Sequence, residues 1–195
     1  MLASLMSVTA CQPRPGSSAQ VTPVYNQQTG RLEQLIADRQ GDGKVDMRAY
    51  MSGTHLTLIE IDRNRDGHPD RWEYYGQTPA GEAKTLRVLL IRAEEANGPD
   101  SRVTRREFYV KGVLDHVEED TDVDGRIDKW EQYENGALVR IDLDLSGRGF
   151  ADHRMTYRAD GSLEATTIDS TGDRGLKGSA PTPEAASPTR GGGDE

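Results

Sequence analysis

Short runs rich in Leu and β-branched residues recur along the chain, and a turn signal precedes most of them. The runs are HLTLIEI, TLRVLLIRA, GVLDHVE, ALVRIDL and SLEATTI, and aromatic-bearing runs stand before the turns, as in RWEYY, RREFY, KWEQY and HRMTY. The β-branched and aromatic residues of these runs favour strands. Turn pairs such as Asn135-Gly136 and Asp160-Gly161 favour tight hairpins, because these turns need positive φ. The pattern predicts successive β-hairpins and no helix of useful length.

The hairpins recur with a period of 24 residues, and an acidic loop joins each hairpin to the next. The steps between loop starts are 24, 34, 24, 24 and 25 residues, for loops that begin at Asp38, Asp62, Ala96, Asp120, Asp144 and Asp169. The long step holds an insertion of about ten residues around 77–84. A fixed period of this length indicates a repeat architecture. We therefore predict an all-β protein, an elongated antiparallel meander of about six β-hairpin repeats over residues 24–175, with acidic loops along one edge and tight turns along the other.

The composition predicts flexible segments on both sides of the repeat domain and a protein that binds cations. Only 34% of the 195 residues are hydrophobic and 29% are charged, so a thick globular core is not expected. Residues 12–23 and 176–195 are rich in Gly, Pro, Ser or Thr, and are predicted to be a flexible tether and a disordered tail. The net charge of −9 disfavours nucleic acid as a partner and suits divalent cations.

The N-terminal segment carries the one cysteine of the sequence. Residues 1–11 form a short apolar run that ends in Val8-Thr9-Ala10-Cys11, and this ending resembles a bacterial lipobox. The resemblance implies a lipoprotein-type signal segment over 1–11, lipidation of Cys11, and a protein anchored to a membrane of the bacterial cell envelope. Gln12 after the cysteine favours the outer membrane, on its periplasmic or surface face. The alternative is an ordinary apolar N-terminus with a free thiol.

Two acidic loops place oxygen-bearing side chains at the spacing of a calcium ligand set. Counted from the first aspartate, positions 1, 3, 5 and 9 carry Asp or Asn, position 6 is Gly, and position 7 offers a backbone carbonyl. Without a cation so many carboxylates would repel one another, so we predict bound Ca²⁺. The predicted ligands are Asp62, Asn64, Asp66, His68 and Asp70 in one loop, and Asp120, Asp122, Asp124, Arg126 and Asp128 in the other.

These two loops resemble the EF-hand loop in their polar positions, including Glu73 and Glu131 at position 12. An EF-hand loop is flanked by helices, whereas the flanking sequences here favour strands. Three strand residues span roughly 10 Å, which would carry a glutamate at position 12 away from an ion held by position 9. We therefore expect both glutamates to be poor ligands. The D-x-D-x-D-G-x-x-D loops of thrombospondin type 3 and dockerin modules are the better resemblance.

The remaining loops keep the frame less completely. A weaker metal site is predicted at Asp38, Gln40, Asp42 and Asp46. The loop that begins at Asp144 has Arg148 at position 5, and we expect this arginine to repel calcium and act as an internal counter-ion. The loop at Ala96 has lost its ligands. For every loop the alternative is a set of Asx-turns that need no metal, since Asp, Asn and Gly all favour such turns.

The predicted function follows from these features. Trp72, Trp130 and the recurring tyrosines are expected to pack across strands, although an aromatic row could also bind a sugar or a peptide. The sequence contains no nucleophile elbow, no HExxH and no phosphate-binding glycine loop. We predict a non-enzymatic, calcium-binding lipoprotein whose sheet is a spacer or a platform for a protein or glycan partner. The alternative is a metal-independent, immunity-like recognition module whose acidic edge binds a basic partner.

Overall fold

The computed structural model describes residues 19–80, 83–97, 102–169 and 175–176. The predictions for the signal segment, for lipidation of Cys11, for residues 12–18 of the tether and for the tail beyond residue 176 lie outside the described residues.

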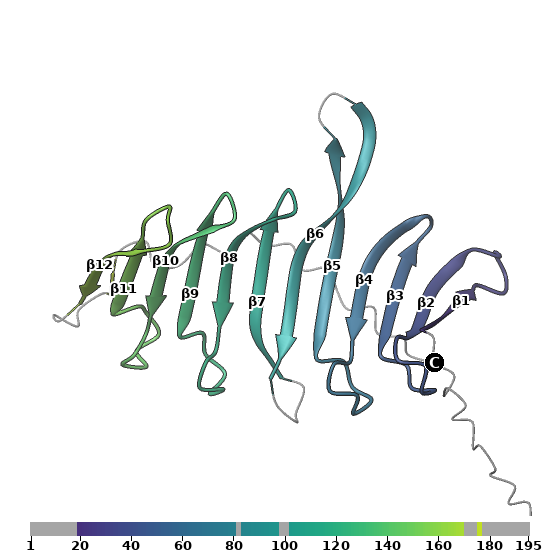
Figure 1. The fold of residues 1–195 in the computed structure, drawn as a ribbon, viewed down its shortest axis with the longest axis horizontal. Helices are drawn as coiled ribbons and strands as arrows, with labels where there is room; N and C mark the ends of the chain where they lie inside the picture. The colour runs from purple at the N-terminus through teal and green to yellow at the C-terminus, as the bar shows by residue number, and fades with distance from the viewer. Residues whose placement is uncertain (1–18, 81–82, 98–101, 170–174, 177–195) are drawn as a thin grey trace, which may run out of the picture.

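The described residues form one antiparallel sheet of twelve strands, and the strands lie in the order of the sequence (Figure 1). The fold-class prediction is confirmed, because each strand from β2 to β11 pairs with the strand before it and the strand after it, and no helix is present in the described residues. The strands are β1 (Gln20–Tyr25), β2 (Leu32–Asp38), β3 (Met47–Ser52), β4 (His55–Ile61), β5 (Arg71–Ala80), β6 (Ala83–Ala96), β7 (Val103–Val110), β8 (Val113–Glu119), β9 (Lys129–Glu134), β10 (Ala137–Leu143), β11 (His153–Tyr157) and β12 (Leu163–Ile168).

The two edges of the sheet differ in chemistry, as the sequence predicted. Tight turns connect β1 to β2, β3 to β4 and so on along the upper edge of Figure 1, and the acidic loops lie along the lower edge. We call these the turn edge and the loop edge. The insertion predicted at 77–84 lengthens β5 and β6 to 10 and 14 residues, so this hairpin rises above its neighbours at the turn edge.

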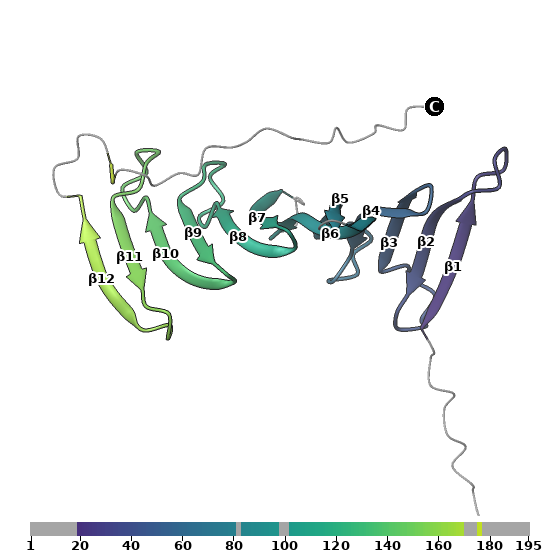
Figure 2. The ribbon, with the colours of Figure 1, turned by 90° about the horizontal axis from the view of Figure 1, so that it is seen from above.

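The sheet is twisted, and β1 and β12 are its two open edges. Viewed from above, the middle strands are seen nearly end-on while β1, β2, β11 and β12 are seen lengthwise, so the strand direction rotates along the row (Figure 2). This is the rotation that the right-handed twist of strands accumulates in an open sheet. Nothing in the described residues forms a second layer, so the sheet must be stabilised by contacts between side chains on its own faces.

Strand β1 begins at Gln20, before the predicted start of the repeat domain at residue 24. The last residues of the segment predicted as a tether therefore pair with β2, from Gln20 opposite Asp38 to Tyr25 opposite Leu32. The sequence pattern assigned this stretch to the tether because proline, here Pro23, is typical of linkers. An edge strand tolerates proline when the missing N–H points away from its partner.

One face of the sheet buries small apolar residues under ion pairs. Ala93 lies between Glu73 and Glu107 on the neighbouring strands, Val117 lies between Glu107 and Glu131, and both Ala93 and Val117 are 0% exposed. The aliphatic stems of long charged side chains can cover apolar surface while their charged groups stay in water. We call this surface the ion-pair face, and its charged residues are Arg71, Glu73, Glu95, Arg105, Glu107, Glu119, Lys129 and Glu131.

The opposite face carries the aromatic packing that was expected. Trp72 and Tyr74 are each 9% exposed and form a cluster with Ala96, against which Leu58 packs. The Tyr74 hydroxyl donates to Glu94 at 2.9 Å. Packing is therefore confirmed for this part of the aromatic series.

Three tyrosines on the ion-pair face make the sheet sensitive to high pH. The hydroxyls of Tyr75, Tyr109 and Tyr133 donate to the glutamate two residues earlier at 2.9, 2.8 and 2.8 Å. Burial, and then the neighbouring glutamate, raises the pKa of each tyrosine to about 12. A raised pKa stabilises the fold fully below the ordinary value near 10, and this stabilisation is lost as pH rises through 12.

We therefore expect urea unfolding to show a steady loss of stability between pH 10 and 12. Replacing all three tyrosines by Phe should lower stability at pH 8 and flatten this pH dependence. Tyr25→Phe is a matched control, because Tyr25 is 56% exposed on the edge strand. An unchanged slope in the triple variant would contradict the assignment.

Candidate metal centre

In the two loops with the calcium spacing, the aspartates at positions 1 and 9 hold the loop closed through backbone N–H groups. In the loop at Asp120, Gly125 N donates to Asp120 Oδ2 at 2.8 Å and Thr121 N donates to Asp128 Oδ1 at 3.0 Å. In the loop at Asp62, the equivalent distances are 2.8 Å from Gly67 N to Asp62 Oδ2 and 2.9 Å from Arg63 N to Asp70 Oδ2. Both aspartates therefore act as caps that shape the loop.

The loops with poor metal spacing are closed in the same way. Gly43 N donates to Asp38 Oδ2 at 2.6 Å, and Gly149 N donates to Asp144 Oδ2 at 2.5 Å. Although burial acts in the opposite direction, backbone N–H donors of its own loop, led by Gly43 and then Gly41, lower the pKa of Asp38 below its ordinary value. The recurrence of Asp at positions 1 and 9 thus has a structural cause that applies with or without an ion.

Neighbouring loops are also joined to one another. The N–H of a residue at position 1 donates to the carbonyl oxygen at position 9 of the loop before it, as in Asp62 N to Asp46 O at 3.0 Å and Asp144 N to Asp128 O at 2.8 Å. The loop at Ala96 keeps this bond, at 2.8 Å from Ala96 N to Asp70 O, although it has lost the acidic residues. The backbone hydrogen bonds that join one 24-residue repeat to the next therefore do not depend on the acidic side chains.

Position 4 is a second conformational requirement that sequence reasoning missed. Val123 has φ 65° and Gly125 has φ 97°, so positions 4 and 6 of this loop both lie in the left-handed region. Arg65 and Gly67 repeat the pattern with φ 65° and 95°. The signal in the sequence is glycine at position 4 of two other loops, Gly41 and Gly147.

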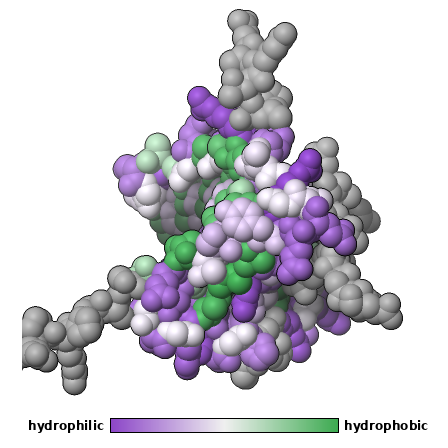
Figure 3. All heavy atoms as spheres, turned by 90° about the vertical axis from the view of Figure 1, so that its right-hand side faces the viewer, coloured by the Kyte–Doolittle hydropathy of each residue, from purple (hydrophilic) through white to green (hydrophobic). Residues whose placement is uncertain are grey.

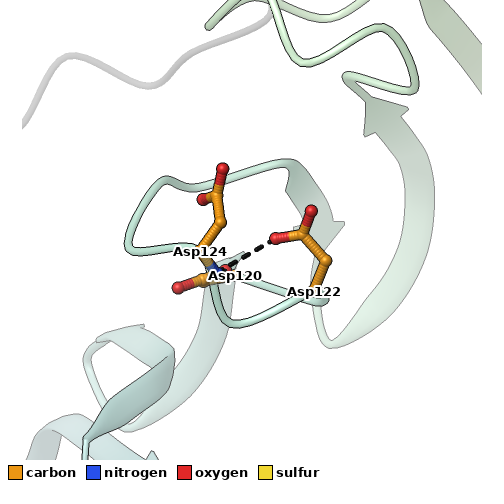
Figure 4. Close-up of side chains that lie close together, drawn as sticks. All are labelled: Asp120, Asp122 and Asp124. Atoms are coloured by element: carbon orange, nitrogen blue, oxygen red, sulfur yellow. Dashed lines mark hydrogen bonds between the residues drawn. The ribbon is translucent and has the colours of Figure 1, made fainter.

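Three carboxylates converge in the loop at Asp120 (Figure 4). One carboxylate oxygen from each of Asp120, Asp122 and Asp124 lies within 4.8 Å of the others. Asp120 is buried at 4% exposure, while Asp122 and Asp124 are exposed. The Asp124 N–H donates to Asp122 Oδ1 at 3.1 Å, which draws positions 3 and 5 together. A set of three converging carboxylates can hold a metal ion.

Asp128, the predicted ligand at position 9, lies outside this group of carboxylates. Both oxygens of Asp128 accept the Thr121 N–H, at 3.0 and 3.2 Å, and Oδ2 also accepts its hydroxyl at 2.8 Å. The Arg126 backbone N–H donates to Asp124 Oδ1 at 2.8 Å. Thus the structure groups positions 1, 3 and 5, and it uses position 9 to close the loop.

The glutamates at position 12 lie on the ion-pair face. Glu131 is in β9, where Lys129 Nζ approaches it at 2.7 Å and Arg105 at 3.5 Å. Glu73 is in β5, where Arg71 Nε lies 2.8 Å away. The strand expected after each loop is present, and each glutamate is engaged by cations of the sheet.

The loop at Asp62 keeps fewer charges at its centre. The Asn64 side-chain amide donates to Asp66 Oδ2 at 3.1 Å, and the His68 N–H donates to Asp66 Oδ1 at 2.8 Å. Within the described part of the chain, Asp70 Oδ1 is buried and has no hydrogen-bond donor. With asparagine at position 3, this loop presents a weaker donor set for a cation than the loop at Asp120.

The weaker site at Asp38 already has a protein cation. The Arg65 side chain reaches back from the next loop, where it donates to Gln40 Oε1 at 2.7 Å and pairs with Asp42. Its hydrogen bond to Asp42 is the main cause of the lowered pKa of that carboxyl. Arg39 pairs with Asp46 at 2.7 Å. Sequence reasoning missed Arg65 because the contact exists only when consecutive loops stack side by side.

In the loop at Asp144, Arg148 forms the internal ion pair that was predicted. Its guanidinium lies 3.8 Å from Asp152 and donates through Nε to Ser146 Oγ at 2.7 Å. A cation at position 5 thus occupies the region where the loop at Asp120 carries its third carboxylate.

Comparison with known proteins gives no family for this chain. No protein-family model matches it, and no curated protein matches it. A solved structure titled "Crystal Structure of TarM" aligns with a TM-score of 0.39 and 12% sequence identity, over 60% of this chain and 21% of that chain. This likeness is too weak to bear on function. The described residues also contain no helix with the length and apolar character needed to cross a membrane.

Proposed function

We propose that this protein is a non-enzymatic, calcium-binding repeat lipoprotein of the bacterial cell envelope. Calcium is structural in this proposal, and the sheet is a spacer or a platform for a protein or glycan partner. The observation that carries the proposal is the convergence of Asp120, Asp122 and Asp124 in one loop of a repeated frame. Membrane attachment rests on the lipobox-like sequence that ends at Cys11.

Calcium fits this donor set better than zinc or copper. The cluster offers only carboxylate oxygens, which are hard ligands, whereas zinc and copper sites use His or Cys. Neutralising three carboxylates that lie within 4.8 Å of one another would relieve their mutual repulsion. In the loop at Asp62, an ion could also engage the buried oxygen of Asp70 that no donor satisfies within the described residues.

Calcium should raise the melting temperature of the full chain. At a Kd of about 10⁻⁴ to 10⁻³ M, typical of extracellular modules, 10 mM calcium adds about 1 to 3 kcal/mol of stability. Differential scanning calorimetry in EDTA and in calcium measures the effect. No shift in melting temperature at 10 mM calcium would contradict the proposal.

A charge-removing variant locates the site. Asp122→Asn with Asp124→Asn should remove most of the calcium-induced shift, because asparagine keeps the shape and loses the charge. Asp115→Asn with Asp160→Asn is the matched control, since both residues lie outside the acidic loops. Any shift that remains is assigned to the loop at Asp62 if adding Asp66→Asn removes it.

The second candidate is metal-independent recognition of a basic partner. It is favoured by the caps at positions 1 and 9, which close the four loops that begin at Asp38, Asp62, Asp120 and Asp144 through backbone N–H groups with no ion required. In that case a partner would be retained in EDTA and released at high salt, because exposed charge pairs are screened. A partner retained only in calcium would favour the first proposal.

A further inference from the structure

The open ends of the sheet carry exposed apolar side chains. On β1, Val21 is 60% exposed and Tyr25 is 56% exposed, and on β12, Leu163 is 52% exposed and Ile168 is 57% exposed. Figure 3 shows the β1 end, where hydrophobic atoms gather along the sheet with hydrophilic atoms around them. Exposed edge strands are templates for pairing with another chain. We propose that β1 of one copy pairs with β12 of a second copy, so that the sheet continues from end to end.

Strand direction fits this pairing. Every odd-numbered strand that follows an acidic loop runs from the loop edge to the turn edge, and β1 runs the same way because the turn to β2 follows it. Strand β12 runs in the opposite direction. Placed beside β12, β1 of a second copy is therefore antiparallel, as every neighbouring pair in the sheet already is.

The repeat frame also sets the register. The residue before loop position 1 pairs with the residue after position 9, as in Ile61 opposite Arg71 and Leu143 opposite His153. Ile168 precedes position 1 of the last frame, Asp169.

Within its hairpin, Val21 pairs with Ala37 as His153 pairs with Ile168, so Val21 holds the position that follows a loop. The frame thus places Val21 of the second copy opposite Ile168. The two exposed side chains would then meet on one face.

Where β12 ends, the backbone hydrogen bond that joins consecutive loops is still formed. Asp169 N donates to Asp152 O at 2.8 Å, as Asp144 N donates to Asp128 O. In the interior, the chain at this point continues through a loop into the next strand. The chain leaves β12 and enters β1 at this same edge, so β1 of a second copy occupies the place of the next strand.

The other two exposed residues, Leu163 and Tyr25, are equivalent to residues that line apolar grooves near the turn edge. A cavity of about 620 Å³ between β2 and β3 is lined by Leu32 and Met51, and one of about 370 Å³ between β10 and β11 is lined by Leu138 and Tyr157.

Leu163 pairs with Tyr157 as Leu32 pairs with Tyr25, so Leu163 is the equivalent of Leu32 and Leu138. Tyr25 is likewise the equivalent of Tyr157. In the proposed contact, Leu163 and Tyr25 of the second copy line the next groove of the row.

Pro23 limits the strength of the contact. Asp62 N donates to Asp46 O at 3.0 Å, and backbone groups alternate along a strand, so the N–H of Ala49 points away from β4. Pro23 is the equivalent of Ala49 and turns its nitrogen to the open edge. One donor is therefore missing from the added ladder. Proline on an edge strand is a common restraint on pairing, and the association is accordingly weak and reversible.

Sedimentation velocity of the full chain, in EDTA with a reducing agent, tests the proposal independently of calcium and of Cys11. The weight-average mass should rise with concentration. Val21→Lys and Ile168→Lys should each remain monomeric at all concentrations. Leu145→Lys is the matched control and should associate like the wild type, because Leu145 is 65% exposed and belongs to the loop between β10 and β11 rather than to an edge strand. Pro23→Val should associate about fivefold more tightly, as expected for one restored hydrogen bond.

Mixing the two edge variants decides the geometry. Val21→Lys keeps an intact β12 edge and Ile168→Lys keeps an intact β1 edge, so a head-to-tail contact yields a one-to-one dimer that grows no further. Self-association of Val21→Lys alone would overturn the proposal, since it would show pairing through β12 only. A monomeric mixture alongside an associating wild type would overturn it too, as would a wild type and a Pro23→Val variant that both stay monomeric.

Discussion

Replacing Arg105 by alanine is expected to lower the free energy of unfolding by about 3 kcal/mol, near the lower end of the cost of breaking a buried ion pair because the site keeps some solvent access. The Arg105 guanidinium is 20% exposed and lies 3.3, 3.0 and 3.5 Å from Glu107, Glu119 and Glu131. Without it, Glu119 and Glu131 share the ammonium of Lys129, and Glu107 retains its pair with Arg71.

Urea unfolding at neutral pH measures the loss. Arg105→Lys should recover part of the stability, because an ammonium has the charge but lacks the planar fork that reaches several carboxylates. Glu164→Ala is the control, since Glu164 is 54% exposed and its pair with Arg158 spans 3.9 Å. It should change stability by less than about 0.5 kcal/mol. Equal losses in Arg105→Ala and Glu164→Ala would show that the ion-pair face does not stabilise the sheet.

The stability of the protein at low pH depends on the same ion pairs. Burial opposes ionisation of Glu107, but the Tyr109 hydroxyl, Arg71 and Arg105 together hold the pKa of this carboxyl below its ordinary value of 4.5. A lowered carboxyl pKa gives stability that is complete above the ordinary value and is lost as pH falls through the folded value. The Arg105→Ala variant should therefore lose less stability than the wild type as the pH is lowered below 4.5.

Asp144→Ala is expected to lower the free energy of unfolding by about 3 kcal/mol, the combined cost of two buried charge-assisted hydrogen bonds. Asp144 is 7% exposed and accepts Arg148 N at 3.0 Å and Gly149 N at 2.5 Å. Its loop has a cation at position 5, so the caps can be tested without the influence of a metal ion.

Calorimetry in EDTA and in calcium should therefore give the same loss for Asp144→Ala. Asp144→Asn should lose less, since an amide oxygen still accepts an N–H. The control is Asp160→Ala, which removes an aspartate from an exposed tight turn. A loss seen only in calcium would mean that Asp144 acts as a metal ligand and not as a cap.

Much of this fold could be predicted because its information is local. Turn pairs such as Asn135-Gly136 and the 24-residue spacing of the aspartates lie within one repeat, and both are realised in the sheet. The strand after each loop was also predictable, and it carries Glu131 to the ion-pair face. The start at Gln20 was missed because Pro23 reads as a linker unless the partner strand is known.

The site was only partly predictable. The spacing of Asp120, Asp122 and Asp124 indicated convergence, and the structure shows it. The same spacing could not reveal that both carboxylate oxygens of Asp128 accept hydrogen bonds from Thr121. An aspartate at position 9 can equally well be a metal ligand or a cap.

The sequence by itself determined the period, the hairpins, the two chemically distinct edges and the positions of the acidic loops, since each depends on residues close together in the chain. Only the tertiary structure decided which charges meet. Arg65 pairs with Asp42 one loop earlier, and Arg71 reaches Glu107 two strands away. Such partners are selected by strand register and loop stacking, and these place residues side by side at separations that no local pattern records.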